Sequence, residues 1–116
     1  MEPIFDAGGI TVAWLRGDLI YDLEGYVVGF IRHGAVYDYD GVQFGFFMNG
    51  YFRDGDGNAT AFIRRASGTP LRPIPEIPPI PPIPQIPPIP PIPNIPEIPP
   101  IPTFYWSDLE WEEFIR

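Results

Sequence analysis

The chain has 116 residues, no Cys, no Lys, 18 Pro and a formal net charge of −8 at pH 7. The absence of Cys excludes disulfides and thiolate metal sites, and the acidic balance gives no basic surface for nucleic acid. No segment resembles a signal peptide or reaches the ~20 apolar residues of a membrane-spanning helix. We therefore expect a cytoplasmic protein, with peripheral attachment as the only form of membrane association.

Residues 1–66 contain one sixteen-residue unit written four times. Two columns keep this step without insertion or deletion: Asp6, Asp22, Asp38 and Asp54, and Gly9, Gly25, Gly41 and Gly57. Asp opens a type I turn by accepting backbone N–H groups, and Gly three residues later takes the positive φ that closes a β-hairpin. The repeat therefore predicts four tandem β-hairpins. Because the Asp column is explained by the turns, we expect no metal and no cofactor.

The second strand of each predicted hairpin is apolar on both of its sides. A column of small residues is followed directly by an aromatic column, and the members are Ala13, Gly29, Gly45 and Ala61, then Trp14, Phe30, Phe46 and Phe62. A sheet with one wet face does not need two apolar sides. We predict an all-β head in which the hairpins close a pseudo-fourfold ring or shallow barrel. The four aromatic residues form the candidate apolar pocket.

Arg16, Arg32 and Arg64 share one repeat column, which Met48 interrupts. Guanidinium groups at the rim of an apolar funnel would suit a phosphate or carboxylate, and this column is the candidate anion rim. The alternative is a solvated rim paired with nearby acids. The fourth unit departs from the others at Arg53, Asn58 and Thr60, and we expect its flank to be the wettest.

Residues 67–102 form a Pro-rich linker that contains ten X-Ile-Pro triplets, from Pro73 to Pro102. Pro fixes φ, removes the backbone donor and keeps the preceding residue out of the helical region, which favours polyproline II. Such a spacer would reach on the order of 90 Å if straight. Its Ile residues would share one edge, and we expect that apolar edge to lie against an aromatic surface of its own head, of another copy or of a bundle.

Residues 103–116 form a short aromatic and acidic terminus. Ser107 with Glu110 has the spacing of a capping box, and Trp106 with Trp111 that of a hydrophobic staple, so a helix is expected to begin after Ser107. A helix of this length does not stand alone in water. It should dock on a partner or back on the head, and the candidate docking residues are Trp106, Leu109, Trp111, Phe114 and Ile115.

The four Asp-x-x-Gly hairpins, the small-aromatic pairs, the triplet linker and the Trp-containing terminus together resemble the bacterial fourfold β-flower proteins. The resemblance covers residues 1–66 well and the layout of the rest generally. It implies a shallow symmetric funnel, similar in outline to the Tubby-like and scramblase lipid-binding barrels. The family is functionally uncharacterised, and a likeness of shape assigns no chemistry.

Enzymes usually place a few irreplaceable polar groups where symmetry breaks, whereas this head keeps its symmetry in turns and apolar columns, so we expect no catalysis. The first hypothesis is a non-enzymatic binding or scaffold module. Its rigid spacer would present the C-terminal helix to a protein partner, or mediate self-association. The alternative is lipid or hydrophobic small-ligand binding in the funnel behind the Arg rim, and a metal-assisted enzyme built on the Asp column is a third hypothesis.

Overall fold

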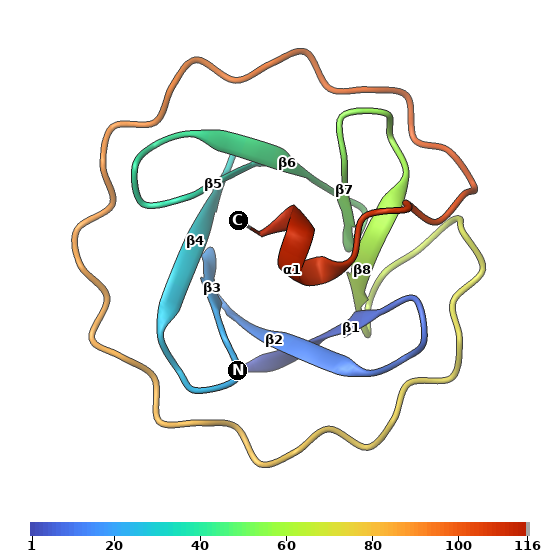
Figure 1. Ribbon diagram of the computed structural model, residues 1–116, viewed down its shortest axis with the longest axis horizontal. Coiled ribbons are helices and arrows are strands. Elements are labelled where there is room, and N and C mark those ends of the chain that lie inside the picture. Colours follow the sequence, from blue (N-terminus) through green and yellow to red (C-terminus); the bar gives the residue numbers. More distant parts are fainter. Residues whose placement is uncertain (116) are drawn as a thin grey trace.

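A computed structural model describes residues 1–115 and contains a closed antiparallel barrel. Each strand pairs with its neighbours in sequence, and β1 closes the barrel on β8 (Figure 1). The elements are β1 (Glu2–Asp6), β2 (Thr11–Arg16), β3 (Leu19–Tyr21), β4 (Val27–Arg32), β5 (Ala35–Tyr37), β6 (Gln43–Met48), β7 (Tyr51–Arg53), β8 (Ala59–Ile63) and α1 (Trp111–Phe114). The predicted all-β class and closed ring are confirmed.

The turns between paired strands are built by the Asp and Gly columns. The Oδ1 atom of Asp22 accepts the backbone N–H groups of Glu24 and Tyr26, both at 2.9 Å, and Gly25 takes a φ of +95°. Equivalent bonds are made by Asp6, Asp38 and Asp54. Within residues 1–115, no cluster of acidic or His side chains is arranged to hold a metal ion. The Asp column therefore acts on the backbone.

Each second strand of a hairpin carries one residue that the first strand does not pair. In β1–β2, for example, Ile4 faces Ala13 and Phe5 faces Thr11, so Val12 is left out of the register. The same shift occurs in the other three hairpins. A bulge of this kind bends the strand and increases its twist, which helps a small sheet to close on itself. The four bulged residues are Val12, Val28, Phe44 and Thr60.

The barrel interior is filled by apolar residues from both strands of every hairpin. Its fully buried members include the column Ile4, Ile20, Val36 and Phe52. Ala13 and Ala61 belong to the same cluster, as expected for small residues near the axis. Trp111 and Phe114 of α1 complete the cluster, so the interior is a packed core to which the C-terminus contributes.

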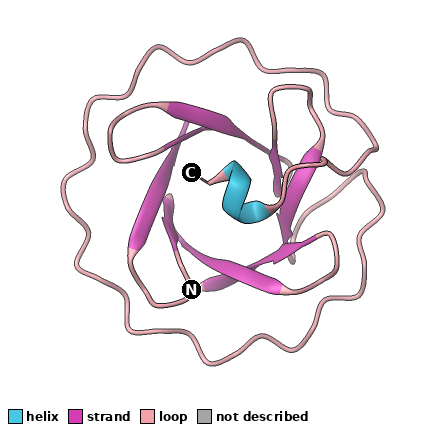
Figure 2. Cartoon of the chain, in the orientation of Figure 1, coloured by secondary structure: helices cyan, strands magenta, loops and turns pink. Residues whose placement is uncertain are grey.

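The Pro-rich segment circles the barrel. Residues 73–102, called the belt below, contain no helix or strand (Figure 2) and run around the outside of the barrel in a nearly closed ring (Figure 1). The Cα atoms of the molecule span only 36 × 35 × 22 Å. The segment is therefore not a straight spacer, because it is bound to its own head at several points along its length. The polyproline II conformation stays a prediction.

The C-terminal helix is shorter than expected and begins later. Glu110 is its N-cap and exchanges capping-box bonds with Glu113. Ser107 lies three residues before this N-cap and does not cap α1: its hydroxyl donates to the Oδ2 atom of Asp54 in the last hairpin turn and accepts the N–H of Leu109, which precedes the helix. The prediction of a capping box at Ser107 is thus wrong. Among residues 1–115, no helix is both long and apolar enough to cross a bilayer.

Candidate functional site

The belt is fastened to the barrel at the glycines that close the hairpin turns. The carbonyl oxygens of Gly9, Gly25, Gly41 and Gly57 accept bonds of 2.8–3.1 Å from the backbone N–H groups of Glu76, Gln85, Asn94 and Thr103, respectively. The acceptors are sixteen residues apart and the donors nine. Because Pro has no N–H, only a residue other than Pro can donate at these points. Three triplets of the belt therefore span one hairpin of the barrel.

The same glycines let the belt come close. A Cβ atom built on Gly9 would lie 2.7 Å from the carbonyl oxygen of Ile74, and one on Gly41 would lie 2.9 Å from that of Ile92. The approach is closer still at Gly25 and Gly57. Glycine is thus favoured at these positions for two reasons: it adopts the positive φ of the turn, and it lacks the Cβ atom that would collide with the belt.

Side chains add a second set of bonds between belt and barrel. They join a polar belt residue to the start of a second strand, and the pairs are Thr11 with Glu76, Val27 with Gln85, and Gln43 with Glu97. In the first two pairs the belt side chain accepts a strand N–H, both at 2.9 Å. In the third pair the direction reverses, because the Oε1 atom of Gln43 accepts the N–H of Glu97 at 2.8 Å.

The outer edge of the belt is apolar. Each of its ten Ile residues, from Ile74 to Ile101, is 87–94% exposed. The belt does lie on its own head, which is one of the three arrangements that the sequence suggests. The orientation is the reverse of the expected one, because the Ile side chains point away from the barrel and the backbone groups face it.

The candidate aromatic pocket does not lie in the barrel interior. Phe62 packs with Phe5 and Tyr51 in one cluster, and Phe30 packs with Tyr37 in another, both distinct from the core that contains α1. Trp14, Phe30, Phe46 and Phe62 are all buried. Their strand partners, such as Tyr21 for Trp14 and Arg53 for Phe46, share their face of the sheet. The four aromatic residues therefore cover the outer wall of the barrel.

The candidate Arg rim is exposed and lies away from α1. Arg16 and Arg32 end β2 and β4, whereas Phe114 of α1 packs on Phe44, near the beginning of β6. Arg32 stands over Phe30 at 5.4 Å and Arg64 over Phe5 at 5.2 Å. These Arg residues are therefore at the opposite end of the strands from the mouth that α1 fills.

One cavity brings together a member of the Arg column and a member of the aromatic column. It has a volume of about 560 Å³, and its lining includes Phe30, Arg32 and Pro90 of the belt. Arg16 and Arg64 do not line it. The predicted rim and pocket residues thus meet at one place and do not form a common site around the axis.

The fourth hairpin binds the chain at both ends of the belt, and its distinctive residues Arg53 and Thr60 are buried. Arg53 is 2% exposed and donates to the carbonyl oxygens of Gly57, at 2.8 Å, and Thr103, at 3.0 Å. It also donates to the carbonyl oxygen of Thr69, so one guanidinium holds the chain where the belt begins and where it ends. Burial lowers the pKa of Arg53, and Tyr51 and Asp54 oppose that effect. Thr60 is buried as well, so the expected wet flank is wrong.

The candidate docking residues of the terminus are divided between two faces of the barrel wall. Trp106 lies outside with Phe5, Tyr51 and Phe62, and forms a bridge to Ala59. Trp111 and Phe114 are buried inside. The Phe114 ring packs edge-on against Phe44, with centroids 5.2 Å apart. Leu109 is exposed and Ile115 half-buried. The terminus therefore docks on its own head.

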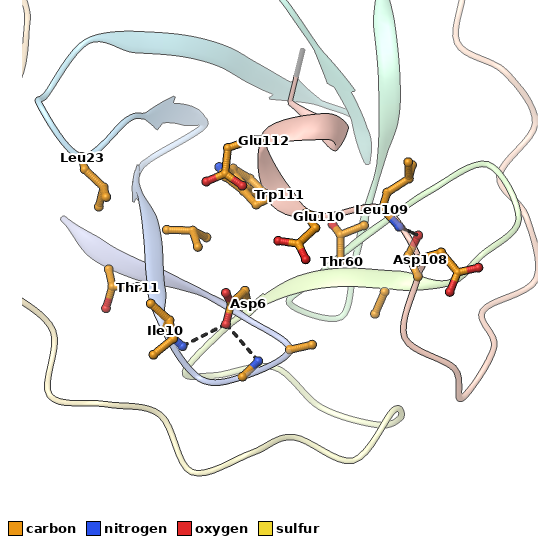
Figure 3. Close-up of a pocket in the computed structure, with 15 residues that line it drawn as sticks. Asp6, Ile10, Thr11, Leu23, Thr60, Asp108, Leu109, Glu110, Trp111 and Glu112 are labelled. Atoms are coloured by element: carbon orange, nitrogen blue, oxygen red, sulfur yellow. Dashed lines mark hydrogen bonds between the residues drawn. The ribbon is translucent and has the colours of Figure 1, made fainter.

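A cleft remains beside α1 at the barrel mouth (Figure 3). It has a volume of about 420 Å³ and lies between the β1–β2 turn, the start of β8 and residues 107–112. Its apolar lining includes Ile10, Leu23 and Leu109, and its charged lining is acidic throughout. The cleft exists because one helix occupies one side of a wide mouth, where α1 contacts β8.

Sequence reasoning missed the residues that fasten the belt. They carried a signal, because Glu76, Gln85, Asn94 and Thr103 recur every nine residues in a segment otherwise dominated by Pro and Ile. The four donors, nine residues apart, match in number the four turn glycines, which are sixteen residues apart. Arg53 also carried a signal, as a charged residue in a column otherwise occupied by Phe5, Tyr21 and Tyr37.

Comparison with known proteins gives one match. A family model described as "4-fold beta flower protein" matches residues 2–115, which include the belt and α1. No curated protein and no solved structure matches the chain. The description of the family names no activity, substrate or partner.

Proposed function

The chain belongs to the 4-fold beta flower family, and we propose that it is a non-enzymatic scaffold module that associates with further copies of itself through the outer edge of the belt. One observation carries this proposal: ten exposed Ile side chains follow one another around the whole circumference. Single exposed apolar residues are ordinary on protein surfaces. A continuous apolar edge is different, because such patches mark sites of association.

The shape of the edge determines the kind of association. The belt is convex, so a neighbouring disc can touch only a few Ile residues at one point of contact. Stable pairs bury about 800 Å² on each partner, which a contact of this size does not reach. Because the edge offers equivalent contacts in every direction, one copy can bind several neighbours at once, and weak contacts then add. We expect lateral assemblies to form in place of a closed dimer.

The polar groups of the head support a role without catalysis. The Asp column is bound to turn N–H groups, and Arg53 is bound to three backbone carbonyls. These groups already have structural partners, which leaves them poorly suited to act on a substrate.

The alternative, a lipid or small apolar ligand inside the barrel, gains no specific support. Trp111 and Phe114 occupy the mouth, and a ring carbon of Phe114 lies only 2.4 Å from where a Cβ atom on Gly45 would stand. A ligand would first have to displace α1.

Sedimentation velocity of the full chain, over a concentration series up to about 1 mM, tests the proposal. We expect reversible association that strengthens with added salt, because screening reduces the repulsion between copies of charge −8 while the apolar contact persists. Changing Ile77, Ile80, Ile86 and Ile89 together to Thr removes four of the ten exposed Ile side chains and should weaken the association.

The matched control changes four exposed apolar residues of the hairpin turns to Thr, namely Ile10, Leu23, Tyr26 and Val42. This control should associate like the unchanged chain. A chain that stays monomeric throughout the series, or a control that loses association as completely as the belt variant, would disprove the proposed role of the Ile edge.

A further inference from the structure

A cavity lies between the belt and the two turns that connect the first hairpin to the second and the second to the third. It has a volume of about 560 Å³, and its apolar lining includes Leu19, Phe30 and Pro90. Phe30 is only 2% exposed and packs on Tyr37 and Tyr39, at centroid distances of 5.4 and 5.5 Å. Neighbouring rings thus hold the aromatic lining in place, and the size of the cavity is that of a site for a small molecule.

Arg32 lines the same cavity. Its guanidinium carbon stands over the Phe30 ring, 5.4 Å from the centroid. A guanidinium stacked on a ring keeps the N–H groups in its plane available for a carboxylate. The ion pair among residues 1–115 joins Arg65 and Glu2, so Arg32 has no acidic partner in the described part of the chain. The ring therefore orients Arg32 and leaves its donors for a ligand.

Asp18 brings the opposite charge to this cavity. Its backbone carbonyl accepts the N–H of Ile31 at 2.8 Å, which holds the β2–β3 turn beside the end of β4. Its carboxylate is exposed and makes no ion pair with Arg32. Two opposite charges therefore line one cavity without neutralising each other, and a ligand that carries both charges can pair with each of them.

This combination occurs once in the fourfold repeat. The sixteen-residue step relates Asp18 and Arg32 to three other pairs of positions, which are Glu2 with Arg16, Gly34 with Met48, and Gly50 with Arg64. Two of these pairs lack the acid, and in the remaining pair the acid is bonded to Arg65. The turns and apolar columns do not require the pair of Asp18 and Arg32, so a role in ligand binding is open to it.

We infer that this cavity binds a small zwitterion with an apolar side chain, which is the chemical class of the aromatic amino acids. The carboxylate of the ligand would accept from the Arg32 guanidinium, and its ammonium group would donate to Asp18. Its side chain would pack on Leu19, Phe30 and Pro90. A simple anion would be repelled by Asp18, whereas a zwitterion satisfies both charges. The site does not depend on association through the Ile edge, so either proposal can fail alone.

The test uses the full chain labelled with ¹⁵N and L-phenylalanine as the probe. Titration should shift the amide signals of residues 18–19 and 30–34 in a saturable way. Two further probes each lack one charge: N-acetyl-L-phenylalanine has no ammonium group, and L-phenylalaninamide has no carboxylate. Each should bind about twofold to fivefold more weakly than phenylalanine, as expected for the loss of one exposed ion pair.

Two variants assign the charges to their partners. Arg32→Met introduces the residue type that the third hairpin has at Met48 and should remove the preference for phenylalanine over phenylalaninamide. Asp18→Asn should remove the preference for phenylalanine over N-acetylphenylalanine. Both positions are exposed, so the fold should persist.

The matched control is Arg16→Met, because Arg16 belongs to the same column as Arg32 but does not line the cavity. It should bind phenylalanine as the unchanged chain does. The inference is overturned if no saturable shift occurs at the named residues, if the two probes with one charge bind as well as phenylalanine, or if Arg16→Met weakens binding as much as Arg32→Met.

Discussion

The barrel and the belt are both repeats rich in apolar residues, yet they use these residues in opposite ways. Ile20 in β3 is fully buried, whereas Ile80 in the belt is 92% exposed. The barrel strands are bonded to a neighbour on each side, while the belt donates one backbone bond to a turn glycine in every nine residues. The apolar residues determine the position of the strands, and the bonds made by the polar residues of the belt determine its position.

This difference shows that a periodic row of apolar residues does not always mark a buried face. In a strand, backbone groups are satisfied within the sheet, so burial of side chains decides which face turns inward. In the belt, Pro removes 16 of the 30 backbone donors, and the N–H groups of Glu76, Gln85 and Asn94 reach fixed acceptors on the turns. Once those bonds are made, the Ile side chains face solvent.

The largest effect should come from removing the ring by which α1 joins the apolar core of the barrel. Phe114→Ala leaves a cavity between α1 and β6, and we expect the free energy of unfolding to fall by about 3–5 kcal/mol. Urea denaturation measures the change. Phe104→Ala, at an exposed position of the same segment, should cost less than about 0.5 kcal/mol. A cost below about 1 kcal/mol for Phe114→Ala would mean that α1 only rests on the barrel.

A smaller effect should come from a methyl group placed between turn and belt. Gly25 and Gly17 both have positive φ, but a Cβ atom on Gly25 overlaps the belt and one on Gly17 meets nothing within 4 Å. We expect Gly17→Ala to cost about 1 kcal/mol and Gly25→Ala about 2–3 kcal/mol. The difference, measured by urea denaturation, reports the belt contact alone. If both substitutions lowered the free energy of unfolding equally, the belt would be able to move away from Gly25 at no cost.

The smallest effect should come from extending the Pro pattern through a fastening point. Gln85→Pro removes the N–H that Gly25 accepts and the side chain that Val27 uses, so we expect a loss of about 1–2 kcal/mol. Pro88→Gln, at the same triplet position one unit later, should be neutral within about 0.5 kcal/mol. Thermal unfolding of the two variants side by side checks this. If Gln85→Pro proved neutral, the bond to Gly25 would not be what fastens the belt at this point.

The sequence was sufficient for the closed barrel, because its turns and apolar columns are local features that repeat in register. Asp22 and Gly25 specify a turn wherever they occur at this spacing, and Ala13 allows close packing at the axis. The sequence did not indicate which face of the barrel the aromatic column would cover. That choice depends on the bulge at Val12, and a shift of one residue exchanges the two faces of a strand.

The candidate site was harder to predict, because it depends on contacts between distant segments. Ser107 has the sequence context of a helix cap, but its backbone and hydroxyl are bonded to Ala59 and Asp54 of the last hairpin, and the helix begins later, after Glu110. Arg53 looked like a solvated replacement in an aromatic column, but its carbonyl partners come from both ends of the belt. The Ile edge was predicted to be buried because hydrophobicity was considered without the direction of the backbone bonds.

The match between nine belt residues and sixteen barrel residues has a consequence for how the gene can change. Duplication of one hairpin adds an acceptor that three further triplets must reach, and loss of one hairpin leaves three triplets too many. Insertion of a single triplet moves every later donor away from its glycine. We therefore expect copy number in the barrel repeat and in the belt repeat to change together, by one hairpin and three triplets at a time.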